Sequence, residues 1–237
     1  MKSWGRLAAI GSVVSAVLVF AVPAWSQTPP NLMEPVAKAY GLDSFGQIEV
    51  LRYTFNAELP GINLSRSWVW QPKTGEISYE GKDKDGKPVK ANYRESQVSG
   101  QPADVKDVIE PAFINDQYHL LFPIRVFWDG GAALRDDGTQ KLPIGTGSAR
   151  GVVVDYSPGD VWEIFLGPDN RIRQFTFHRG GPRKPGVVIA TWDGYAKAGP
   201  LLLATDRRGT ADGAPLRIWF TDVAVKLQGS DNWVKAQ

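Results

Sequence analysis

Few side chains in this 237-residue sequence could do acid–base chemistry at neutral pH. It has two histidines, His119 and His178, and no cysteine, so cysteine nucleophiles and thiolate metal sites are excluded. Asp116 lies three residues before His119, and on a helix the two side chains would share one face. Because no third ligand accompanies them, we favour a structural interpretation, with Asp at a helix start and His hydrogen-bonded. We expect neither a metal nor a cofactor.

Three other stretches resemble binding motifs, but their sequence context argues against each. Gly145–Gly151 is glycine-rich, yet it leads into a β-branched run and not into the helix that a phosphate loop requires. Asp83–Gly86 resembles a calcium loop, but Arg94 stands at the twelfth position, where a bidentate Glu is needed, so we expect a hairpin tip. We interpret a basic cluster as a solvated bend; it consists of Arg179, Arg183 and Lys184.

The first 26 residues have the pattern of a secretory signal peptide. Lys2 and Arg6 precede an apolar run over 7–22, and small residues follow. We expect cleavage before Gln27, or alternatively after Ala24, and a periplasmic or secreted protein in which residues 27–237 form a single domain. Without a cysteine there is no lipid anchor, and we expect no stable membrane insertion after cleavage. Removing the signal leaves 25 basic and 25 acidic residues, a balance that does not favour nucleic acid as a partner.

Two helices are predicted, and the longer one carries Asp116 and His119. The main one covers 109–122, where Ile109 and Phe113 begin an apolar pattern near helical spacing. Pro123 is expected to end it, because the residue before a proline avoids helical angles. A shorter helix is predicted over 32–40 from apolar residues at intervals of four.

Alternating apolar and polar residues predict strands over most of the remaining chain. A short strand is expected over 124–129, and a long surface loop over 130–147. The turns are short, which favours antiparallel connections over βαβ units. The predicted fold class is therefore mainly β (α+β): a curved antiparallel sheet of about ten strands that forms an incomplete barrel, covered by the two helices. The other predicted strands are 47–59, 62–71, 76–80, 88–94, 151–156, 161–166, 171–179, 187–195, 201–206 and 216–227.

Several of these strands are apolar on both faces. In 216–227, for example, Leu216 and Ile218 oppose Trp219 and Val223. Such a sheet needs cover on both sides or encloses an apolar hollow, and one long helix cannot cover about ten strands. Two outcomes stay open: a hydrophobic pocket, or a barrel filled by its own side chains.

Two short segments carry a family resemblance. Arg66, Trp68 and Trp70 in one strand, and the segment NDQYHLLFP over 115–123, resemble the LolA/LolB-like periplasmic half-barrel proteins, the outer-membrane lipoprotein carrier class, and especially an uncharacterised branch of that superfamily. His119 stands where such proteins usually have Trp. The resemblance covers most of 47–227. It implies an incomplete barrel wrapped over helices that binds acyl chains or another hydrophobic ligand without catalysis.

We therefore expect a non-enzymatic carrier or binding protein whose partner is a hydrophobic small molecule or lipid, with an envelope protein as a second candidate partner. The alternatives are a periplasmic hydrolase using His119 and Asp116, or an envelope interaction protein with a filled core. The side chain of Arg66 either reaches a ligand headgroup or packs along the strand with its guanidinium exposed to water. The predicted ligand-binding residues are Trp68, Trp70, Phe113, Leu120, Phe122, Trp162, Ile164, Trp219 and Arg66.

Overall fold

The computed structural model describes residues 31–156, 159–181 and 186–237, which build one sheet of thirteen strands. The predicted signal peptide and its predicted cleavage site lie outside these residues. Every strand pair is antiparallel. The strands are β1 (Ile48–Leu59), β2 (Ile62–Gln71), β3 (Glu76–Lys82), β4 (Pro88–Arg94), β5 (Ala133–Lys141), β6 (Ser148–Asp155), β7 (Val161–Leu166), β8 (Ile172–His178), β9 (Val187–Thr191), β10 (Asp193–Ala198), β11 (Leu201–Ala211), β12 (Ala214–Leu227) and β13 (Trp233–Lys235).

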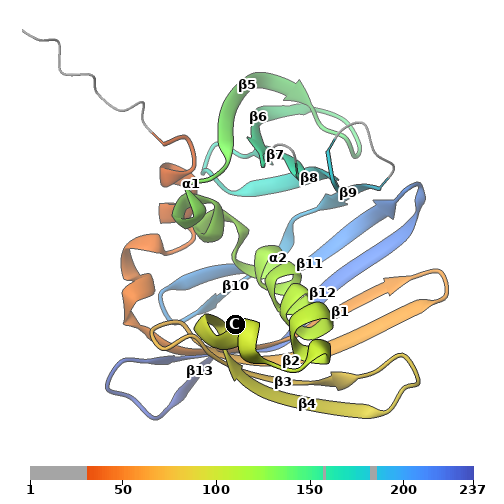
Figure 1. Ribbon diagram of the computed structural model, residues 1–237. Helices are drawn as coiled ribbons and strands as arrows, with labels where there is room; N and C mark the ends of the chain where they lie inside the picture. The colour runs from red at the N-terminus through yellow and green to blue at the C-terminus, as the bar shows by residue number, and fades with distance from the viewer. Residues whose placement is uncertain (1–30, 157–158, 182–185) are drawn as a thin grey trace, which may run out of the picture.

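The sheet is open, and its order is β4-β3-β2-β1-β12-β11-β9-β8-β7-β6-β5, with β10 on β11 and β13 on β12. Strand β11 changes partner along its length: its first half pairs with β10, and Gly209–Ala211 pair with β9. A Cβ at Gly209 would lie 1.8 Å from the carbonyl oxygen of Ile189, so only glycine permits this approach. Figure 1 shows the β5–β9 arm folded over the rest of the sheet. The predicted incomplete barrel is confirmed, with thirteen strands in place of about ten.

Helix α2 (Glu110–Asp129) lies in the hollow between the two arms of the sheet (Figure 1). The predicted helix end at Pro123 and the predicted strand over 124–129 are wrong. Only Leu121 leaves helical angles, at φ −112° and ψ 16°, so the proline kinks the helix, which continues to a left-handed Gly130. The continuation buries Ile124 and Val126, whose side chains would otherwise stay in water.

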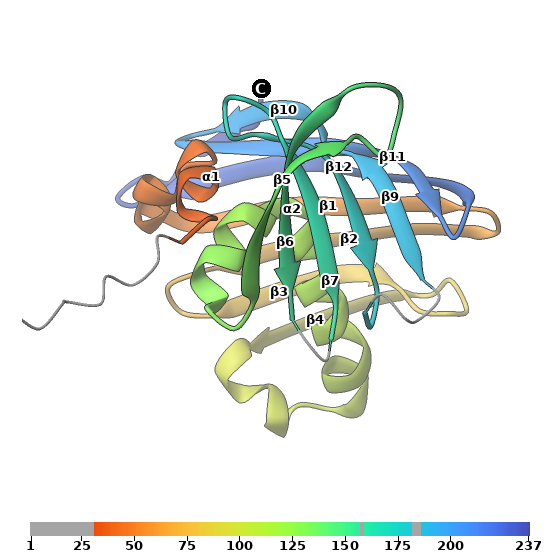
Figure 2. The same ribbon diagram turned by 90° about the horizontal axis from the view of Figure 1, so that it is seen from above.

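The remaining helical segments are short. Helix α1 confirms the predicted short N-terminal helix, and Figure 2 places it at the opposite end of the molecule from the tips of the β1–β2 and β11–β12 hairpins. No helix among the described residues is long and apolar enough to cross a membrane. These segments are α1 (Glu34–Ala39), η1 (Leu42–Gln47), η2 (Glu95–Gly100) and η3 (Val105–Ile109), which leads into α2.

Two predictions in the second half of the chain are also wrong. The predicted loop over 130–147 contains β5, an edge strand with polar residues on both faces that pairs with β6. The predicted strand over 187–195 is two strands, β9 and β10, which are separated at the buried Trp192. The strand breaks there because β9 pairs with the end of β11, at 209–211, whereas β10 pairs with its first half, at 201–206. The predicted meander over β1–β4 and the hairpin tip at Asp83–Gly86 are confirmed.

The core lies where α2 contacts both arms of the sheet. Phe113 packs against Trp68 and Trp70 on β2, with ring centroids 5.3 and 6.1 Å apart. At the kink itself, between Leu121 and Pro123, Phe122 packs against Trp162 on β7 with ring centroids 4.6 Å apart. Aromatic pairs at such separations add to the free energy gained by burial, so α2 holds the two arms in place.

Candidate ligand pocket

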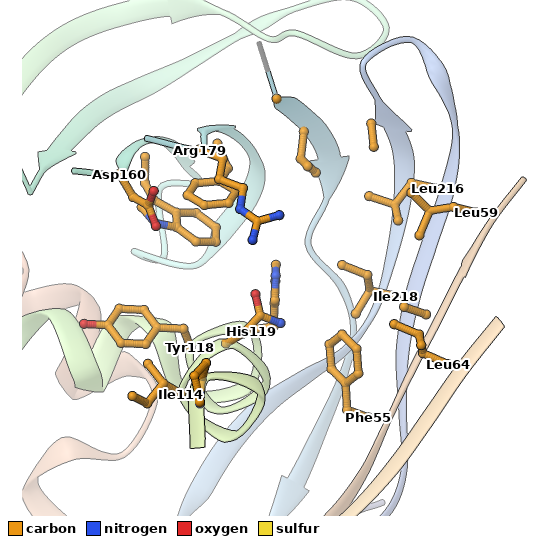
Figure 3. A pocket seen from close by; sticks show the side chains of 18 of the residues that line it. Phe55, Leu59, Leu64, Ile114, Tyr118, His119, Asp160, Arg179, Leu216 and Ile218 are labelled. Atoms are coloured by element: carbon orange, nitrogen blue, oxygen red, sulfur yellow. The ribbon is translucent and has the colours of Figure 1, made fainter. Parts of the chain in front are cut away.

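A cavity of about 800 Å³ lies between the concave face of the sheet and α2. Strands β1, β2 and β12 form one wall, α2 forms the floor, and the β6–β7 turn with β7, β8 and β9 forms the opposite wall (Figure 3). The apolar lining residues are Phe55, Ala57, Leu59, Leu64, Pro111, Ile114, Trp162, Phe177, Val188, Ala211, Leu216 and Ile218.

Strand alternation makes the β1 and β12 wall apolar. Phe55, Ala57 and Leu59 follow one another at every second position of β1 and share its concave face. Leu216 and Ile218 do the same on the paired strand β12. The result is a continuous hydrocarbon surface that comes from local sequence pattern and sheet pairing together.

The rim of the cavity is apolar and reaches solvent. Leu64 on β2 and Ile114 on α2 are 37% and 42% exposed, although both are large hydrophobic residues. Tyr118, one helical turn after Ile114, lies with its hydroxyl 3.1 Å from that of Tyr156 and so ties the floor to the β6–β7 wall. The cavity is therefore open on the side that these residues flank.

Arg66 lines the cavity, but its charge is paired. Its Nε and Nη2 donate to the two carboxylate oxygens of Asp116 at 2.8 and 2.5 Å. Trp68 Nε1 and Asn115 Nδ2 donate to the same carboxylate at 2.9 and 3.1 Å. Burial raises the pKa of Asp116 to about 6, against the lowering effects of Arg66, Asn115 and Trp68. Arg66 thus ties β2 to α2, which neither sequence interpretation of this residue anticipated.

His119 lies on the cavity floor within an aromatic cage. Its ring is 6.0 Å from Phe55, 5.6 Å from Trp162 and 6.3 Å from Phe175, measured between centroids. Burial, assisted by the charges of Arg207 and Arg66, lowers the pKa of His119 to about 3. The imidazole is therefore neutral at ordinary pH, and no hydrogen bond joins it to Asp116, whose oxygens are occupied by other donors. A general base has a pKa near the working pH and a partner that orients it, and His119 differs from such a base in both respects.

Two of the nine residues predicted to bind ligand line the cavity, namely Arg66 and Trp162. Trp219 lies on the opposite face of β12, under the guanidinium of Arg217 at 4.6 Å. The aromatic character that singled out most of these residues also suits the core beneath the cavity. That core contains the other six, which are Trp68, Trp70, Phe113, Leu120, Phe122 and Ile164.

Sequence reasoning missed most of the lining. The alternation of Phe55, Ala57 and Leu59 was a usable signal, because it repeats on the strand predicted over 47–59. Nothing local marked Tyr118 or Arg179, whose places depend on how α2 and β8 meet across the hollow. Among the described residues no three His, Cys, Asp or Glu side chains form a group that could hold a metal.

Distant structural likenesses accompany this architecture. The chain is similar to a DUF1329 family protein from Desulfovibrio piger, with TM-score 0.40, 9% identity, and coverage of 83% of this chain and 95% of that one. It is similar to a putative outer membrane lipoprotein-sorting protein domain from Vibrio parahaemolyticus, with TM-score 0.45, 9% identity, and coverage of 84% of this chain and 93% of that one. It is also similar to a LolA superfamily protein from Nitrosomonas europaea, with TM-score 0.39, 8% identity, and coverage of 79% of this chain and 90% of that one.

One of these solved structures is a LolA superfamily protein, the superfamily that the sequence resembles. No family model matches the sequence, and no curated protein matches it.

Proposed function

We propose that this protein is an exported, non-catalytic carrier or binding protein that holds a lipid-like, hydrophobic ligand in the concave face of its half-barrel. The observation that carries the proposal is the apolar cavity of about 800 Å³ between β1, β12 and α2. Small-molecule sites in proteins commonly measure about 300–1,000 Å³ and are lined mainly by apolar side chains. The predicted signal peptide over 1–26 supports the exported location.

An apolar ligand should bind here because the apolar wall of the cavity has an unfavourable free energy when it is left in water. Each Å² of apolar surface removed from water contributes about 25 cal/mol, so a hydrocarbon chain laid along Phe55, Leu216 and Ile218 is stabilised on both sides of the contact. The one charge that β2 brings to this wall, on Arg66, is already paired with Asp116. A flexible apolar chain is the kind of molecule that such a wall favours.

A pocket-filling variant tests the proposal. Ala57 points into the cavity from β1, and Ala57→Phe would occupy the space without removing a contact. Ala133→Phe, at an exposed position of β5, is the matched control. Titration with 11-(dansylamino)undecanoic acid should give saturable binding to the wild type and to Ala133→Phe, and about tenfold weaker binding to Ala57→Phe, a loss of about 1.4 kcal/mol.

The melting temperature of each variant shows whether it is folded. Absence of saturable binding to the folded wild type, or equal affinity of the two variants, would contradict the proposal.

A further inference from the structure

Arg179 stands out among the charged residues of the cavity. It follows β8 directly, and its backbone N–H donates to the carbonyl of Gly186 at 3.0 Å, which holds its position against the start of β9. Its guanidinium is directed into the cavity from the wall that faces α2 (Figure 3). Within the described residues it takes part in no ion pair.

The other charged side chains of the lining are engaged. Arg66 is held by Asp116. Asp160 accepts the backbone N–H of Gly180 at 2.6 Å. Asp212 accepts the N–H groups of Gly186 and Val187 at 3.0 and 2.8 Å, so both lining carboxylates are fixed by the backbone around the β8–β9 connection. Among the described lining residues, the positive charge that stands outside an ion pair is therefore the guanidinium of Arg179.

His119 supplies a second polar group, on the cavity floor. It is 5% exposed, and its Nδ1 has no hydrogen-bond partner among the described residues. Its imidazole points into the cavity from α2, opposite the β8 wall (Figure 3). A neutral imidazole carries one N–H. Because Nδ1 is buried, the tautomer that donates to an acceptor in the cavity carries this hydrogen on Nε2.

We infer that the ligand is an amphiphile with an anionic head, a carboxylate or a phosphate, bound by Arg179 with a hydrogen bond from His119. Its chain then lies against the apolar wall of β1 and β12. The planar guanidinium presents a fork of N–H donors that matches both heads. This inference rests on the proposed function and adds the chemistry of the ligand head to it.

Three ligands with the same sixteen-carbon chain separate the head from the tail: hexadecanoic acid, hexadecyl phosphate and hexadecan-1-ol. Calorimetric titration, below their aggregation concentrations, uses the wild type, Arg179→Ala and Arg173→Ala. Arg173 is the matched control, because it lies on β8, the strand that Arg179 follows, is exposed and pairs with Asp169 away from the cavity. The wild type and Arg173→Ala should bind at least one of the two anions at least tenfold more tightly than the alcohol.

Arg179→Ala should lose this preference while its affinity for the alcohol stays unchanged, and Arg179→Lys should retain part of it. Preference for either anion supports the inference, and the tighter one identifies the head. Equal binding of acid, phosphate and alcohol by the wild type overturns it and leaves the carrier function standing. An unchanged preference in Arg179→Ala also overturns it. Binding of none of the three ligands overturns the proposed function itself.

Discussion

Arg207 Nη2 donates a hydrogen bond of 2.6 Å to the backbone carbonyl of His119. In an uninterrupted α-helix this carbonyl would accept the N–H of residue 123, but that residue is proline and has none. Arg207, fully buried on β11 with its guanidinium 3.7 Å from the Trp192 ring centroid, supplies the missing donor. The sheet thereby fixes the kinked part of α2 that forms the cavity floor.

Arg207→Met should lower the free energy of unfolding by about 2 kcal/mol, because a buried carbonyl loses its partner. Relief from burying a charge limits the loss. In a Pro123→Ala background the helix regains its own N–H donor, so the same substitution should cost about 1 kcal/mol less. Urea unfolding of the four proteins in this cycle measures the difference. An equal loss in both backgrounds would show that Arg207 does not act through this carbonyl.

The neutral state of His119 predicts acid sensitivity. Burial lowers the pKa of His119 to about 3 from an ordinary value of 6.5, so between these values the unfolded chain binds a proton that the folded chain does not. The free energy of unfolding of the wild type should therefore fall, relative to His119→Gln, as the pH falls below 6.5. Between pH 7 and pH 5 the change should be about 2 kcal/mol.

Urea unfolding of both proteins at the two pH values measures this change. If the difference between wild type and His119→Gln stays constant, His119 titrates normally, and its use as a general base returns to consideration.

Asp116 predicts the opposite pH dependence. Burial raises the pKa of Asp116 to about 6 from 3.8, so the folded state keeps a proton that the unfolded state has released. The free energy of unfolding of the wild type should fall, relative to Asp116→Asn, as the pH rises from about 4 to about 6. Carboxyl ¹³C NMR of Asp116 should show a midpoint near pH 6. A midpoint at or below pH 4 would mean that the pairing with Arg66 outweighs burial.

The parts of the fold that local pattern determines could be predicted from the sequence. The β1–β4 meander follows from alternation and turn residues, and the observed antiparallel pairing of these strands agrees with it. Strand β5 could not be found in this way, because its residues are polar on both faces and its place depends on backbone pairing with β6. Where α2 continues past Pro123, the main-chain carbonyl of His119 accepts a hydrogen bond from Arg207, a residue 84 positions after the proline that no local pattern relates to it.

The site was harder to predict for a related reason. Trp68 and Trp162 carry the same local signal, a large aromatic residue on a predicted strand, yet the first belongs to the core and the second also lines the cavity. The difference arises from where α2 crosses the sheet, which no local pattern specifies. Arg179 likewise looked like part of a solvated bend, and its direction becomes visible only in three dimensions (Figure 3).

Chain length should control affinity if the apolar wall holds a hydrocarbon tail. Burial of one methylene contributes about 0.8 kcal/mol, so the dissociation constant should fall about fourfold for each carbon added to a saturated fatty acid until the cavity is filled. Calorimetric titration of the series from eight to eighteen carbons measures this slope. Affinity that does not change with length would mean that the tail stays in water.

The most direct measurement is a crystal structure of the protein with ω-bromohexadecanoic acid, in which anomalous scattering locates the bromine at the end of the chain. The account predicts one bromine peak inside the cavity bounded by Phe55, Trp162 and Ile218. A cavity without ligand density, or bromine bound only on the outer face of the sheet, would contradict the central claim.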